Sequence, residues 1–172
     1  ESVPLDALIP LWEGVLEPVF PTQAKAEGKA EPVLCTKRHI ITPKERFARP
    51  RAAVIAFPGT NCEIDTARAV ERAGGRAQIT VVRNLTSAAL EESVLAVAEA
   101  IRSSQILILP GGFSGGDEPD GSAKFITAFF RSPRLIDAVH QLLYKQDGLI
   151  LGICNGFQAL IKLGLVPYGE IV

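Results

Sequence analysis

Residues 148–158 read Gly-Leu-Ile-Leu-Gly-Ile-Cys-Asn-Gly-Phe-Gln, and this stretch decides the fold that we expect. Its first half is an apolar run typical of a buried strand, and a helix is predicted over 155–163, ended by the glycine that follows. Cys154 stands between the two, with Gly152 and Gly156 two residues away on either side. This spacing is that of a nucleophile elbow, a sharp turn from strand to helix that presents one reactive side chain.

The predicted elbow gives Cys154 a functional interpretation. Side chains at Gly152 and Gly156 would clash where the backbone passes close to itself. The sulfur would lie at a helix N-terminus, where the helix dipole stabilises negative charge, and the amide of Asn155 would face the same space and stabilise an oxyanion. The alternative is a small, buried core cysteine. The strand, the two glycines and the helix start together favour the nucleophile.

The composition is that of a globular protein. The chain has 172 residues, enough for one core plus an extension, and a net charge of −1, which excludes strong attraction to nucleic acid or an anionic membrane. No apolar run is long enough to span a bilayer, and the first residues have neither a basic start nor an apolar signal core, so secretion is not expected. Three widely spaced cysteines, Cys35, Cys62 and Cys154, indicate neither a disulfide framework nor a metal site and fit a cytoplasmic protein.

Residues 1–50 are predicted to be an irregular N-terminal extension, because they hold seven of the twelve prolines. Apolar residues between 5 and 16 predict a short helical segment interrupted at Pro10. Residues 36–51 carry six Lys or Arg side chains against one Glu. We interpret this basic stretch as a solvated linker; the alternative is an anion site.

From Arg51 onward, apolar runs alternate with helical patterns, which predicts an α/β fold. We expect an open, mainly parallel, flavodoxin-like sheet with helices on both faces. Thr60 to Glu63 reads as a capping box at the start of one helix, and Leu95 is expected on the inner side of another. The expected strands are 52–57, 77–82, 105–109 and 149–153. The expected helices before the elbow are the one that this capping box opens, which runs to 73, and those over 87–103, 122–130 and 133–146.

A glycine-rich loop, Pro-Gly-Gly-Phe-Ser-Gly-Gly, begins at Pro110, directly after the third expected strand. Four glycines in six residues allow backbone amides to approach a bound group closely. A flexible turn without function is the alternative. The position favours a binding loop, since ligands of open α/β sheets bind beyond the carboxyl ends of the strands.

The loop and the elbow together resemble class I (triad) glutamine amidotransferase domains. Residues 57–63, 110–114 and 152–158 more narrowly resemble the glutaminase domain of phosphoribosylformylglycinamidine synthases. The resemblance covers about residues 50–172. It implies that 51–172 is the N-terminal part of the amidotransferase domain, and that 1–50 is a connector like the one that precedes this domain in the large, fused synthases.

The resemblance also implies roles for six residues. Cys154 would attack the side-chain amide of glutamine and form a γ-glutamyl thioester. The backbone amides of Gly112 and Asn155 would form the oxyanion hole. The glutamine pocket would be lined by Phe113, Ser114 and Gln158.

The implied activity is the supply of ammonia to an ATP-dependent synthetase domain, which amidates formylglycinamide ribonucleotide in purine biosynthesis. The intact protein would be a cytoplasmic ligase, with glutamine and the synthetase domain as its partners. ATP and magnesium would bind to that synthetase domain, and no cofactor or metal is expected in this segment.

One departure from the family pattern is large. The family completes its triad with a histidine and a glutamate far downstream of the cysteine, and neither His39 nor His140 matches that position. We therefore expect these residues to be a fragment that is inactive alone. The alternatives are a docking module with an incomplete site, another class I amidotransferase, or a peptidase- or glyoxalase-like cysteine protein. Asn155, where the last group usually has histidine, disfavours that last alternative.

Overall fold

The fold is described from a computed structural model. The chain divides into two units, Glu1–Ile41 and Thr42–Val172. None of the described helices is long and apolar enough to cross a membrane. Cys35, His39 and the second half of the glycine-rich loop lie outside the described residues, which are 2–21, 28, 31–32, 34, 36, 42, 45–114 and 121–172.

The first unit contains one helix, α1 (Leu5–Gly14), among its described residues. Pro10 lies inside this helix, so the predicted interruption at Pro10 is wrong. A proline removes one helical hydrogen bond, here to the carbonyl of Asp6. No residue of α1 is buried, and water can therefore satisfy that carbonyl.

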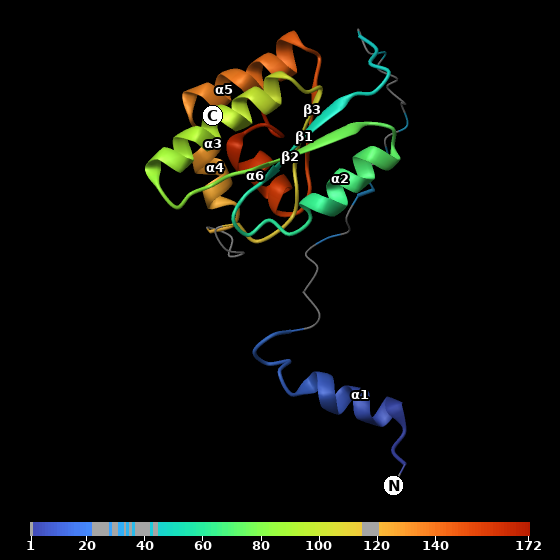
Figure 1. The fold of residues 1–172 in the computed structure, drawn as a ribbon. Coiled ribbons are helices and arrows are strands. Elements are labelled where there is room, and N and C mark those ends of the chain that lie inside the picture. The colour runs from blue at the N-terminus through green and yellow to red at the C-terminus, as the bar shows by residue number, and fades with distance from the viewer. Residues whose placement is uncertain are drawn as a thin grey trace. The chain divides into compact units, whose positions relative to one another are not determined.

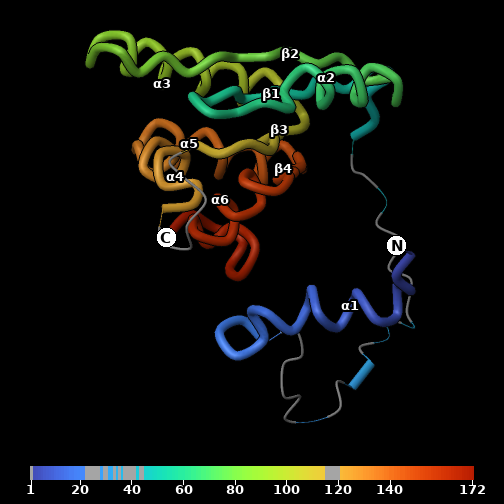
Figure 2. The backbone as a smooth tube through the Cα atoms, turned by 90° about the horizontal axis from the view of Figure 1, so that it is seen from below, coloured from blue at the N-terminus to red at the C-terminus, as the bar shows by residue number. Residues whose placement is uncertain are grey.

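The second unit is built on one parallel sheet of four strands, in the order β2-β1-β3-β4 (Figure 2). The crossover order confirms the predicted open parallel sheet, because each strand returns to the same direction through a helix. Val54 of β1 pairs with Ile79 on one side and with Ile108 on the other. The strands are β1 (Arg51–Ala56), β2 (Arg76–Val81), β3 (Ile106–Leu109) and β4 (Leu149–Gly152).

Helices cover both faces of the sheet, as predicted (Figure 1). One face packs on α2 through Ala52, Val54 and Val70, and the other packs on α3 to α6 through Ala53 and Ile55. Both faces of β1 are therefore buried, which explains its unbroken apolar run. The helices are α2 (Glu63–Arg72), α3 (Ser87–Arg102), α4 (Lys124–Phe130), α5 (Pro133–His140) and α6 (Asn155–Leu163).

Several predicted helix details are corrected by the structure. The expected helix over 133–146 is α5 followed by a π-helical turn, η1 (Gln141–Lys145). The capping box does not form: the Thr60 hydroxyl accepts the Phe57 N–H instead (3.0 Å), and no side chain caps α2. Leu95 is exposed rather than inward, because it lies two residues, or about 200°, from the buried Val97.

We predict that Leu135→Ala destabilises the protein by about 2–5 kcal/mol, because this side chain is fully buried and its removal leaves a cavity. Ile136 is the matched control, since it neighbours Leu135 on α5 and is 36% exposed. Ile136→Ala is expected to cost only about 0.5 kcal/mol. Urea unfolding of both variants measures the difference, and equal losses would contradict the described core.

Candidate active site

The candidate site lies beyond the carboxyl ends of β1, β3 and β4. The segments after β1 and β3 meet in an antiparallel bridge between Thr60 and Gly112. The Phe113 N–H donates to the Gly59 carbonyl (2.9 Å), and the Asn61 N–H donates to the Gly111 carbonyl (3.3 Å). Connections from β1 and β3 leave the sheet in opposite directions at this point, which is where open α/β sheets bind ligands.

Cys154 occupies the turn between β4 and α6 with a strained backbone, at φ +50° and ψ −110°. Such a conformation is rare for a residue with a side chain and persists only where the surrounding structure imposes it. The Gly156 N–H donates to the Ile153 carbonyl (2.9 Å), and the Gln158 N–H donates to the Cys154 carbonyl (3.0 Å). The Cys154 side chain is exposed. The elbow predicted from the sequence is therefore present, and its cysteine is not a core residue.

Both flanking glycines are required by close backbone contacts. A β-carbon on Gly152 would stand 2.7 Å from the Gly156 carbonyl oxygen, and one on Gly156 would stand 2.0 Å from the Leu109 carbonyl oxygen. Real β-carbons do not approach other atoms so closely. The clash expected from the sequence for side chains at these two positions is confirmed. Because Gly156 has no side chain, α6 can begin directly against the end of β3.

Gly111 borders the space in front of Cys154. The point where its β-carbon would stand is 3.4 Å from Cys154 Cβ and 3.6 Å from Cys62 Sγ. Cys62 precedes α2 and donates its thiol hydrogen to Asn61 Oδ1 (3.2 Å). Its nearness to Cys154 was not predicted, because the two cysteines are 92 positions apart in the sequence and only the fold brings them together.

Gly112 has a backbone that disfavours side chains, with φ at +150°. A β-carbon there would stand 2.3 Å from the Gly59 carbonyl oxygen. Neither hydrogen bond of the Thr60–Gly112 bridge uses the Gly112 N–H. The close approach to Gly59 also gives this glycine a packing role, which any substitution at Gly112 would disturb together with the donor.

Asn155 and Ser114 join the glycine-rich loop to α6. Both are buried, and the backbone N–H and the hydroxyl of Ser114 donate to Asn155 Oδ1 at 3.3 and 2.9 Å. The side-chain amide of Asn155 is thus engaged with Ser114 and Gln158. Its backbone N–H belongs to the first residue of α6, where no helical carbonyl is available to accept it.

Gln158 and Phe113 complete the set of residues singled out from the sequence. Gln158 is half-buried one turn after Cys154, and its Oε1 accepts the Asn155 Nδ2–H (3.2 Å). Its second donor is the hydroxyl of Ser122. Ser122 could not be identified from the sequence, because it lies 36 residues from Gln158 in a segment without a motif. Phe113 is exposed, with 59% of its surface accessible.

His140 is not near the elbow by topology. It ends α5, which is followed by η1 and the beginning of β4, whereas Cys154 follows the end of β4. Its ring packs on Tyr144, with centroids 4.7 Å apart. Within the described residues, no group of three or more His, Cys, Asp or Glu side chains is arranged to hold a metal ion.

Comparison with known proteins identifies similar sequences. Residues 49–172 match the family model described as the CobB/CobQ-like glutamine amidotransferase domain. Phosphoribosylformylglycinamidine synthase subunit PurQ of Dehalococcoides mccartyi is 33% identical over 121 residues, which make up 70% of this chain and 43% of that protein. The same subunit of Cereibacter sphaeroides is 42% identical over 117 residues, covering 68% and 44% of the two chains.

A solved structure, that of PurLQS from Thermotoga maritima, is 28% identical to this chain with a TM-score of 0.47. The matched part covers 68% of this chain and 45% of that one. The chain spans less than half the length of the curated relatives named above.

We predict that Cys154 is alkylated by iodoacetamide severalfold faster than Cys62 or Cys35. Cys154 is exposed at the start of a helix, whereas the Cys62 thiol is partly covered and hydrogen-bonded to Asn61. Peptide mass spectrometry after brief labelling measures the three rates. Equal labelling of all three cysteines would count against an activated nucleophile at the elbow.

We further predict that Gly156→Ala destabilises the protein by about 1–3 kcal/mol or more, because the new methyl group must displace α6 from β3. Gly111→Ala is the matched control, since a β-carbon there makes only ordinary contacts of 3.4 Å and longer. Thermal unfolding and the labelling rate of Cys154 should both change in Gly156→Ala. A Gly156→Ala protein as stable as Gly111→Ala would refute the described contact.

Proposed function

Since this chain belongs to the family of CobB/CobQ-like glutamine amidotransferase domains, we propose that it is the nucleophile-bearing part of a glutaminase. The observation that carries the proposal is the exposed Cys154, held in a strained turn at the start of α6. The similarity to PurQ subunits supports a narrower assignment to a phosphoribosylformylglycinamidine synthase.

In the proposed reaction, Cys154 Sγ attacks the carboxamide carbon of glutamine. The tetrahedral adduct collapses with cleavage of the C–N bond, and ammonia leaves after it gains a proton. Water then hydrolyses the γ-glutamyl thioester to glutamate and frees the thiol. The thiol proton must pass to a base and return to the leaving nitrogen, and we assign that relay to a histidine and a glutamate outside these 172 residues.

The oxyanion of the adduct would be bound by the backbone N–H groups of Gly112 and Asn155. Asn155 is the first residue of α6, and Gly112 keeps its N–H out of the bridge with Thr60. Two fixed donors at the position where charge develops stabilise the transition state more than the substrate. Ser114 supports this arrangement by tying the loop to Asn155, while Phe113 and Gln158 would border the bound glutamine.

The ammonia would pass to a synthetase domain or subunit that binds ATP and magnesium and amidates formylglycinamide ribonucleotide. Such a subunit works beside a cytoplasmic synthetase, so we assign the chain to the cytoplasm. We expect no cofactor in this chain, because a thiol, backbone hydrogen bonds and the proton relay assigned above account for the glutaminase steps.

We predict that Cys154→Ala in the full-length protein lowers glutamine-dependent amidation at least about 1000-fold, because the covalent route is lost. Amidation with added ammonium chloride should stay within about twofold, since it bypasses this site. Cys62→Ala is the matched control and should retain most of the glutamine-dependent activity.

Paired assays with glutamine and with ammonia, using formylglycinamide ribonucleotide and ATP, measure both rates. Glutamine-dependent activity that survives in Cys154→Ala would overturn the assignment of the nucleophile. Activity with neither nitrogen donor in the unchanged protein would overturn the assignment to this synthase. A protein that uses ammonia but never glutamine would instead be a docking module.

A further inference from the structure

Four polar side chains, three of them buried, are linked by hydrogen bonds next to the elbow. This line begins at Ser114 in the glycine-rich loop, passes through Asn155 and Gln158 on α6, and ends at Ser122. Ser114, Asn155 and Ser122 are each at most 3% exposed. Hydrogen bonds between such groups are held firmly, because breaking one leaves a buried polar atom without a partner.

The backbone N–H of Ser114 determines which atoms donate and which accept in each of these hydrogen bonds. The Ser114 N–H can only donate, so the side-chain atom of Asn155 that faces it must be the oxygen. Asn155 Nδ2–H therefore faces Gln158, and the Gln158 atom that accepts it must also be the oxygen. The Ser122 hydroxyl donates to the same Gln158 Oε1.

Gln158 Oε1 thus has both lone pairs occupied, and the amide offers a ligand only its Nε2–H donors. Gln158 lies four residues after Cys154, on the same side of the first turn of α6. We propose that Ser122 is a positioning residue, which holds Gln158 so that its Nε2 group binds an oxygen acceptor of the substrate. This inference rests on the proposed function, in which that acceptor belongs to glutamine.

The segment that carries Ser122 is itself fixed. Lys162 Nζ donates to the Ser122 carbonyl (2.8 Å), and the Lys124 N–H donates to the Gly121 carbonyl (3.1 Å). Ala123 is fully buried and has a left-handed backbone, with φ at +56°. A residue with a side chain keeps this conformation only under constraint. The Ser122 hydroxyl therefore comes from a rigid support and can fix the orientation of Gln158.

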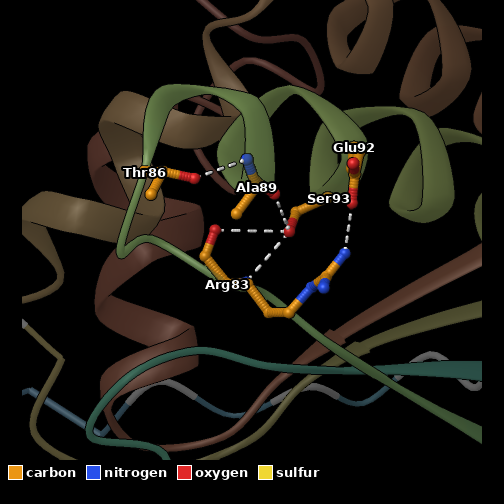
Figure 3. A network of polar contacts seen from close by, with 5 residues as sticks. All are labelled: Arg83, Thr86, Ala89, Glu92 and Ser93. Atoms are coloured by element: carbon orange, nitrogen blue, oxygen red, sulfur yellow. Dashed lines mark hydrogen bonds and ion pairs between the residues drawn. The ribbon is translucent and has the colours of Figure 1, made fainter.

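The test compares Ser122→Ala with Ser93→Ala. Both serines are 3% exposed, so each variant removes one buried hydroxyl group. The Ser93 hydroxyl bonds the Ala89 carbonyl and the Arg83 N–H at 2.7 and 2.9 Å (Figure 3), and neither Ala89 nor Arg83 is one of the site residues. Stability effects of the two substitutions should thus be similar, and only Ser122→Ala should affect glutamine binding.

In the full-length protein we expect Ser122→Ala to raise the KM for glutamine about two- to tenfold, the factor that one lost hydrogen bond corresponds to. The kcat should change less than about twofold, because the reacting atoms are not touched. The glutamine concentration that half-protects Cys154 from iodoacetamide should rise by the same factor. Ser93→Ala should change neither value.

An unchanged KM and unchanged protection in Ser122→Ala would overturn this inference while leaving the proposed glutaminase intact. If the unchanged protein neither hydrolyses glutamine nor is protected by it, the proposed function and this inference both fail. Should Ser122→Ala not fold, Ser122→Cys retains a side chain of similar shape with a weaker donor, and the same rise in KM is expected from it.

Discussion

The contact between Gly156 and the Leu109 carbonyl is the constraint on which the candidate site depends. A β-carbon on Gly156 would lie 2.0 Å from that oxygen, so the first turn of α6 rests directly on the end of β3. The chain must then reverse within very few residues after β4, and Cys154 takes the strained conformation that this requires. The exposure of its thiol and its place at a helix start are both consequences of one missing side chain.

The sheet and most helices could be predicted because their signals are local. Both faces of β1 are covered, which its unbroken apolar run indicates directly. The predictions were wrong where the surroundings of a residue override its local sequence preference. Pro10 did not end α1, since water can reach the free carbonyl, and the Thr60 hydroxyl bonds Phe57 rather than capping α2. The first outcome depends on solvent access and the second on turn geometry, and neither can be derived from the local sequence.

The candidate site was predictable in part for the same reason. Cys154 and its glycines form one contiguous pattern, so the elbow could be identified without a structure. The bond between Ser114 and Asn155 joins residues 41 positions apart, and that between Ser122 and Gln158 joins residues 36 apart. No motif marks Ser122 as part of this line. Contacts of that range come from the packing of α6 against β3, and only the folded chain reveals them.

The strained turn at Cys154 also bears on biosynthesis of the protein. Chains fold from their N-terminal parts onward as they leave the ribosome. β4 follows the other three described strands in sequence, and within the described residues it pairs with β3. Until β4 and α6 have docked, nothing forces Cys154 into its strained backbone conformation. A nascent chain in which β4 has not yet paired with β3 therefore holds Cys154 in a relaxed backbone, and the strained turn arises only when β4 and α6 join the strands that precede them.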